Sequence, residues 1–233
     1  MNSGDFDMER ASTGPGGLFY GVYPAIVQDL QDPDNQGRVK IRLPWSPDTG
    51  SESYEVWARV ATMMGGKDRG TWFIPDVDDE VLVSFEGGNP RRPYVVGGLW
   101  NGKDTPPEKM DSNNNLKSIV SRSDIRITMD DTSGAVKLTI KTPGGHSIVL
   151  DDGQLSVTVQ DSNGNSMKME TSGITITASA KVTVNASSTV EVTAGMVTVN
   201  AAMSKFSGVV KCDTLISNAV VSSSYTPGAG NIW

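Results

Sequence analysis

The stretch from Ile174 to Ser204 repeats one short phrase four times. Its units read ITITASAK, VTVNASST, VEVTAGM and VTVNAAMS. Positions one and three of each unit are Ile or Val, position five is Ala, and positions two and four are Thr, Glu or Asn. This alternation predicts short strands that turn their branched side chains to one side and their polar side chains to the other, with small residues at the corners.

Such a ribbon needs partners. Between Ser172 and Ser204 only Lys181 and Glu191 are charged, so an unpaired ribbon would be prone to aggregate. As a single-chain solenoid, the four units would complete fewer than the three stacked repeats that stability usually requires. Three copies wound around one axis would enclose an apolar centre at every level, and we therefore predict a homotrimer. Its predicted core consists of Ile174, Ile176, Val182, Val184, Val190, Val192, Val197 and Val199.

Residues 17–100 predict a small closed β-barrel of the oligonucleotide/oligosaccharide-binding (OB) kind. The segment RVKIRL alternates without error, with Val39, Ile41 and Leu43 on one face, as in a half-buried antiparallel strand. A first strand is expected to carry Phe19, Val22, Ala25 and Val27, and further strands are expected at residues 54–61, 70–75, 79–86 and 93–100. Closure into a barrel would remove exposed strand edges.

The remaining segments complete an all-β organisation. Residues 1–16 predict an N-terminal tail, because they contain too few apolar groups to order themselves. Residues 101–118 lack a periodic apolar pattern and predict a linker. Residues 119–206 predict a triple-stranded β-helical shaft, which starts with short strands separated by Asx-rich and Gly-ended turns. Residues 207–233 form the predicted tip region.

Several kinds of chemistry find little support. The net charge of -7 argues against a nucleic-acid binder held by counterion release. The lone Cys212 requires no oxidising compartment, and no signal peptide or apolar span is encoded. The pairs Asp130–Asp131 and Asp151–Asp152 precede turns, DSNGNSMKME lacks the glycine of a calcium loop, and His146 has no second ligand nearby in the sequence. We predict no catalytic, cofactor or metal site, and therefore no enzyme.

One rival function remains open. OB barrels often bind single strands, and aromatic side chains can stack bases while cations follow the backbone. The residues that could do so here are Trp45, Trp57, Trp72 and Trp100 with Arg38, Lys40 and Arg42. The alternative function is therefore an OB-fold single-stranded nucleic-acid-binding protein with an oligomerising β stalk.

Long phrases of the chain resemble the central spike proteins of contractile injection systems, the baseplate assembly protein V and VgrG family. They are DNQGRVKIRLPW and residues 57–101 in the barrel, with SRSDIRITMDDTSG, IKTPGGHSIVLDDG and DSNGNSMKMETSGITITASA in the shaft. The resemblance implies an OB-fold barrel followed by a trimeric intertwined β-helix or β-prism needle. It also implies a spike in the virion tail baseplate, or in a related injection particle, which pierces the target envelope when the sheath contracts.

The departures from the family lead to further expectations. About 16 residues precede the barrel, so we expect a separate baseplate hub protein at the N-terminal side. A single histidine excludes the iron-binding His-x-His apex of several short phage spikes, and a small tip-capping protein at the C-terminus is an alternative. We expect the protein to be made in the bacterial cytoplasm without a signal peptide, and to bind no nucleic acid.

Overall fold

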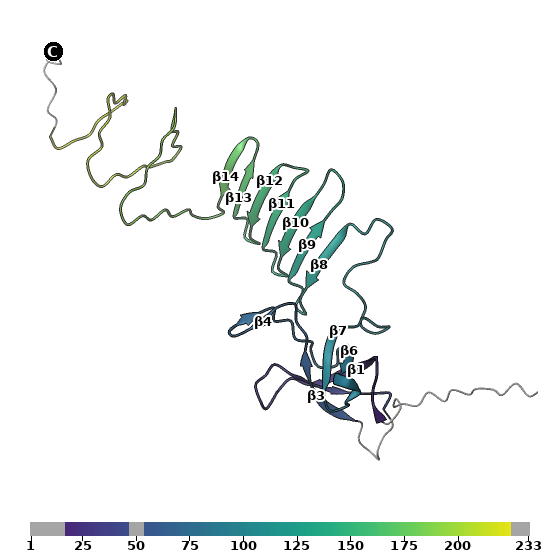
Figure 1. The fold of residues 1–233 in the computed structure, drawn as a ribbon. Coiled ribbons are helices and arrows are strands. Elements are labelled where there is room, and N and C mark those ends of the chain that lie inside the picture. Colours follow the sequence, from purple (N-terminus) through teal and green to yellow (C-terminus); the bar gives the residue numbers. More distant parts are fainter. Residues whose placement is uncertain (1–16, 47–53, 225–233) are drawn as a thin grey trace, which may run out of the picture. The chain divides into compact units, whose positions relative to one another are not determined.

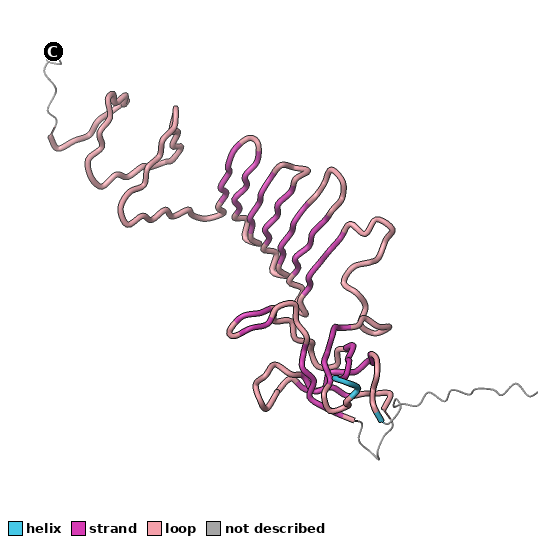
Figure 2. Tube along the Cα trace, in the orientation of Figure 1, coloured by secondary structure: helices cyan, strands magenta, loops and turns pink. Residues whose placement is uncertain are grey.

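The computed structural model describes residues 17–46 and 54–224. The chain divides into two compact units, residues 1–181 and residues 182–233. Within the first unit lie a closed barrel, a two-stranded sheet and a seven-stranded sheet. Strands and loops make up nearly all of the described residues, and helix is confined to short turns near the barrel (Figure 2). The predicted all-β class is confirmed. The predicted tail, residues 1–16, and the end of the predicted tip, residues 225–233, lie outside the described residues.

The barrel is built from five strands in the spatial order β1-β2-β3-β7-β6 (Figure 1). The pairs are antiparallel except for β3 and β7, which run parallel. Closure leaves none of these five strands as an edge, which confirms the predicted barrel. The strands are β1 (Val22–Asp29), β2 (Val39–Arg42), β3 (Glu55–Val60), β6 (Glu80–Phe85) and β7 (Pro93–Gly98), with the 3-10 turn η2 (Glu86–Gly88) between the last two.

The barrel interior follows from the alternation of its strands. Val39, Ile41 and Leu43 are completely buried, as the pattern of RVKIRL predicts. The other core side chains are Phe19, Ala25, Val27, Ala58, Val81, Val83, Phe85 and Val95. Each strand therefore supplies one apolar face to a single core, so the barrel of one chain needs no partner to cover its interior.

Val22, Ala25 and Val27 lie in the first strand, as expected, and Val22 is exposed because Ala25 and Val27 are the inward-facing positions of that strand. One local prediction for the barrel was wrong. The strand expected at residues 70–75 is absent. Only Arg69 and Gly70 are paired there, as β5 (Arg69–Gly70) with β4 (Gly65–Gly66), and residues 71–75 follow as loop.

An aromatic cluster covers one part of the barrel core. The ring of Tyr23 stacks on that of Trp45 with centroids 4.7 Å apart, and Phe19 meets Trp45 edge-on at 5.2 Å. The indole Nε1 of Trp45 donates a hydrogen bond to the backbone oxygen of Pro24 at 2.7 Å. Trp45 therefore packs against its own chain, and its ring is not free to stack a base.

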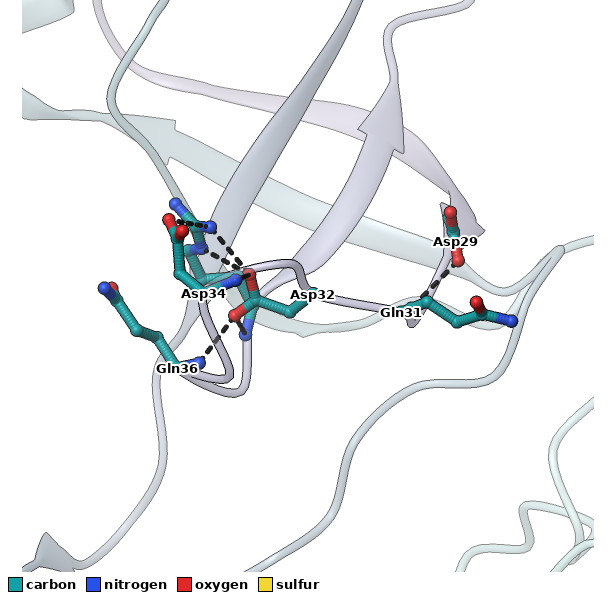
Figure 3. A network of polar contacts seen from close by, with 6 residues as sticks. Asp29, Gln31, Asp32, Asp34 and Gln36 are labelled. Atoms are coloured by element: carbon teal, nitrogen blue, oxygen red, sulfur yellow. Dashed lines mark hydrogen bonds and ion pairs between the residues drawn. The ribbon is translucent and has the colours of Figure 1, made fainter.

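The turn between β1 and β2 is organised around one carboxylate, that of Asp32 (Figure 3). Its oxygens accept hydrogen bonds from the backbone N–H groups of Asp34, Gln36 and Arg38. The guanidinium of Arg38 donates to Asp32 at 2.6 Å and to Asp34 at 2.6 Å. The hydrogen bond from Arg38, together with these backbone donors, holds the pKa of Asp32 well below its ordinary value of 3.8.

The seven-stranded sheet is an antiparallel meander in which consecutive strands pair, from β8 to β14 (Figure 1). Its strands are β8 (Leu116–Val120), β9 (Arg126–Asp130), β10 (Lys137–Lys141), β11 (Ser147–Asp151), β12 (Ser156–Gln160), β13 (Ser166–Glu170) and β14 (Gly173–Thr177). Each strand is five residues long, and each turn folds the chain straight back. In this part of the predicted shaft the hydrogen bonding is therefore within one chain.

A second carboxylate fixes the turn between β12 and β13. Asp161 accepts hydrogen bonds from the backbone N–H groups of Asn163 and Asn165 and from the side-chain amide of Asn165. These bonds, the Asn165 side chain first, lower the pKa of Asp161 to about 2. The carbonyl oxygen of the Asn165 amide in turn accepts from the backbone of Ser179 at 3.0 Å. One turn thus ties down the segment that follows β14.

The second unit lacks the strands that form the first, over the residues that the structure describes. Over residues 182–224, its described part, the chain forms no strand, and its side chains are exposed throughout. The repeated units from Val182 onward lie in this region. A single copy therefore gives them no strand partner.

We predict that Asp32→Asn lowers the melting temperature of the protein at pH 7, because an amide cannot replace the charged acceptor of Arg38 and three N–H groups. Because the pKa of Asp32 is lowered in the folded state, its carboxylate stabilises the fold at pH values above the ordinary pKa of 3.8. This stabilisation is lost as the pH falls below that value. The variant should therefore lose less stability than the parent between pH 5 and pH 2, as followed by circular dichroism.

Asp34→Asn is the matched control. Its side chain is 57% exposed, against 5% for Asp32, and it contacts Arg38 alone. Its melting temperature should stay close to that of the parent. Equal effects of the two substitutions would contradict the central role given to Asp32.

Candidate trimer interface

The seven-stranded sheet carries a continuous apolar face. Its registers bring together two rows, each with one residue from every strand. One row consists of Ile119, Ile127, Ile140, Ile148, Val159, Met167 and Ile176. The other consists of Lys117, Met129, Leu138, Leu150, Val157, Met169 and Ile174. Residues two apart in a strand share a face, so both rows lie on the same side of the sheet. We call these two rows the apolar face.

The opposite face of the sheet is polar. The row between the two apolar rows in sequence reads Ser118, Thr128, Thr139, Val149, Thr158, Lys168 and Thr175. Charged side chains at the strand ends pair across the strands, as Lys137 does with Asp151 at 3.2 Å. This face is suited to water, whereas the first is not.

The apolar face has no cover in its own chain. Side chains from both rows are exposed, among them Ile119, Met129, Ile148, Leu150 and Val159. At about 4.8 Å per strand the seven strands make a patch roughly 30 Å long. Monomeric proteins rarely expose a continuous apolar surface of such length, which marks an interaction site.

The apolar face has a single charged position, which lies in its first strand, β8. Lys117 is the one charged residue in the two rows, and its Nζ pairs with Asp131 at 3.2 Å and with the backbone oxygen of Asn114. The charged end of the side chain is therefore held by the loop before β8 and the loop after β9. Both rows need apolar cover from β9 to the last strand, β14, whereas in β8 only Ile119 does.

The predicted core residues fall in two places. Ile174 and Ile176 lie in β14 and continue the two apolar rows. Val182, Val184, Val190, Val192, Val197 and Val199 lie in the second unit and are exposed in the single chain, where no strand forms among the described residues. That all eight face a trimer axis remains a prediction.

Sequence reasoning missed most of the apolar face. It recognised the segments from residue 124 to residue 170 as short strands, but it named none of their side chains as core. The signal was present, because segments such as IRITM, KLTIK and SVTVQ alternate apolar and polar residues. What the alternation does not give is the register that aligns successive strands into two unbroken rows.

The other residues singled out in the sequence have local partners. Asp130 accepts hydrogen bonds from the backbone and hydroxyl of Thr132, and Asp151 accepts one from the backbone of Gln154. The carboxylate of Asp161 faces its own turn, and His146 is exposed just before β11. Among the described residues, no three His, Cys, Asp or Glu side chains are grouped so that they could hold a metal ion.

Two of the three cations named for the rival function, Arg38 and Lys40, are also engaged. Arg38 is paired with Asp32 and Asp34, and its guanidinium lies 5.8 Å from the ring centre of Trp57. Lys40 pairs with Glu55 at 3.0 Å, and the hydrogen bond that it donates to this carboxylate raises the pKa of the lysine. A phosphate backbone would have to displace these carboxylates, so the geometry does not favour nucleic-acid binding. In the described ranges, no helix is long and apolar enough to span a membrane.

Two families match the chain. Residues 23–100 match the type VI secretion system/phage-baseplate injector OB domain, which covers the barrel. Residues 137–205 match the phage baseplate V C-terminal trimerisation domain, which covers the sheet from β10 onward and the repeated units. The second match supports a homotrimer and falls on the elements that carry the apolar face.

Curated relatives agree with these matches. The type VI secretion system spike protein VgrG1a of Pseudomonas aeruginosa is 34% identical over 134 residues, which cover 53% of this chain and 21% of that protein. The spike protein VgrG3 of Vibrio cholerae is 40% identical over 75 residues, or 32% of this chain and 7% of that protein. The actin cross-linking toxin VgrG1 of Vibrio cholerae is 37% identical over 75 residues, with the same coverage. The chain thus spans about a fifth or less of the length of these relatives.

We predict that Ile140→Asp prevents trimer formation. A carboxylate in the middle of the apolar face would be buried in each of three copies without a partner. The mass in solution, measured by light scattering, should fall from about three times the 24.8 kDa of one chain to the mass of a single chain.

Thr139→Asp is the control, because it introduces the same charge one residue away on the polar face. This variant should remain a trimer. The barrel core contains neither residue, so both variants should keep a folded barrel. A trimeric Ile140→Asp protein of unchanged melting temperature would show that this face is not the interface.

Proposed function

Because the chain belongs to the family of VgrG-like baseplate spikes, we propose that it is the membrane-piercing central spike of a contractile injection system. In this proposal three copies form one rod, which sheath contraction drives through the target envelope. The matches support a location in a phage tail or an injection particle. The observation that carries the proposal is the apolar face of the β8–β14 sheet.

Three copies of this face would give a rod a dry centre. Each chain brings a ready-made antiparallel sheet, so three sheets facing one axis would bury both apolar rows and leave the Thr-rich faces in water. Close-packed protein interiors have low compressibility. A rod with such a centre would transmit an axial load, which is the mechanical requirement on a spike.

The repeated units would continue the rod by a different arrangement. Since residues 182–224 form no strand in the single chain, their backbone hydrogen bonds need partners from other copies. An intertwined needle of three chains supplies those partners and places the eight predicted core residues around the axis. Adding strands from identical chains also closes the exposed edge of β14.

The partners and the lack of enzymatic activity belong to the same proposal. A rod that works by stiffness requires no catalytic group and no cofactor. We propose a separate hub protein at the N-terminal side, a small capping protein at the C-terminal tip, and transient contact with the target envelope. The coincidence of the OB-domain match with the closed barrel supports the barrel as the part that attaches to the baseplate.

We predict that Val190→Glu disrupts the needle, because it would place three carboxylates around one dry axis. Assembled particles carrying this variant should lose killing or delivery activity, and the isolated protein should melt at a lower temperature. Thr183→Glu is the control, since Glu191 already occupies the equivalent second position of its unit. Equal loss in both variants would place Val190 outside the core.

A binding measurement separates the spike from the rival function. Fluorescence anisotropy of a labelled single-stranded oligonucleotide at low salt should show no saturable binding to the full-length protein. Binding that weakens steeply as salt is added would instead indicate phosphate contacts and would contradict the spike proposal.

A further inference from the structure

The barrel carries a projecting hairpin, residues 62–73, which we call the arm. Its two short strands, β4 and β5, form a sheet separate from the barrel. At its base, the hydroxyl of Thr62 donates a hydrogen bond to the backbone oxygen of Thr71 at 2.6 Å. The backbone N–H of Thr71 donates another to the backbone oxygen of Met64 at 3.0 Å. Gly70 has φ +152, and a Cβ there would lie 2.6 Å from the Met64 oxygen. The arm therefore has a defined shape that requires glycine at residue 70.

The arm exposes a group of large apolar side chains. Met63 is 89% exposed, Trp72 75% and Phe73 69%, and Met64 is exposed as well. The turn between the two strands consists of Lys67 and Asp68, and Arg69 begins β5, so the arm has a net positive charge in an acidic chain. A two-stranded hairpin is marginally stable by itself, and exposed Trp, Phe and Met side chains are typical of interface anchors.

The same chain has a surface groove with the opposite character. It encloses about 1000 Å³, and its apolar lining includes Leu30, Val77, Leu99 and Trp100. Four carboxylates also line it, those of Asp76, Asp79, Glu80 and Asp104. Arg122 is the one cation in the lining, and it pairs with Asp76 at 2.7 Å. The groove therefore combines apolar walls with an excess of negative charge.

We propose that the arm of one copy docks into this groove on the next copy around the trimer. An arm with exposed apolar side chains and a net positive charge matches apolar walls with an acidic rim. No residue of the arm lines the groove of its own chain, so the structure leaves the groove open to another copy. The inference rests on the homotrimer but concerns the barrels, which the apolar face of the sheet does not join.

The symmetry of a trimer suits such a contact. An arm and a groove are different surfaces, so the contact runs head to tail, and around a three-fold axis three such contacts close into a ring. The seven-stranded sheets hold the three barrels near one another, which raises the effective concentration of arm and groove. Even a weak contact would then be occupied in the assembled protein.

Cross-linking of the full-length trimer tests the proposal. In a Cys212→Ser background, Lys67→Cys is combined with Val77→Cys, which places one thiol on the arm and one on the groove wall. A short bismaleimide should give covalent dimers and trimers on a denaturing gel. Each single-cysteine protein is a control and should stay monomeric on that gel. Trimers in solution without cross-linked chains, cross-links within one chain, or equal bands from a single-cysteine control would each overturn the inference.

Charge reversal adds a second test in the same protein. Because Lys67 is already replaced by cysteine in the cross-linking variant, the charge is reversed at Arg69 instead. Arg69→Glu should lower the yield of cross-linked chains by roughly tenfold. Asp79→Lys in the groove should restore much of that yield. Loss without restoration would contradict the proposed pairing of charges. Light scattering distinguishes failure of the trimeric spike proposal from failure of the docking proposal. A monomeric protein contradicts both, whereas a trimer without cross-linked chains contradicts only the docking of the arm.

Discussion

The structure depends on one constraint, which is that the apolar face of the β8–β14 sheet has nothing in its own chain to cover it. Two rows of side chains run across every strand without interruption after Lys117. Burial of apolar area contributes about 25 cal/mol per Å², so a patch of this length is a large driving force for association. Because the uncovered face is the same in every copy, identical chains can satisfy one another.

The barrel and the sheet solve the problem of strand edges in different ways. The barrel closes on itself, with the parallel pair β3 and β7 completing the ring around a core of its own. The meander stays open at β8 and β14 and leaves one face bare. A closed barrel can therefore vary its surface for attachment, while the sheet has to keep its apolar rows. In the proposed spike, this division would separate the barrel, as the part that attaches, from the sheet, as the part that bears load.

The sequence predicted the elements that depend on local pattern. RVKIRL identified β2 and its buried face because alternation is a local property. The strand predicted at residues 70–75 was wrong. The segment TWFIP has the composition of a strand, but no barrel strand pairs with it, and its aromatic side chains lie exposed on the arm. The apolar face could not be read in full, because its rows depend on register across six turns of different length. Exposure of the arm and the acidic groove likewise follow from tertiary structure.

The change from meander to repeated units has a cause in turn chemistry. Between β12 and β13 the chain reverses at Asp161–Asn165, where a carboxylate caps the turn and Gly164 has φ +86. The repeated units turn mainly on Ala, Ser and Thr, which offer neither such a cap nor, as a rule, a residue suited to positive φ. A chain without reversing turns cannot pair with its own preceding strand. Its alternating Val and Thr residues still require strand partners, which in the proposed needle come from the neighbouring copies. On that proposal, the composition of the corners selects between a sheet made by one chain and a needle made by three.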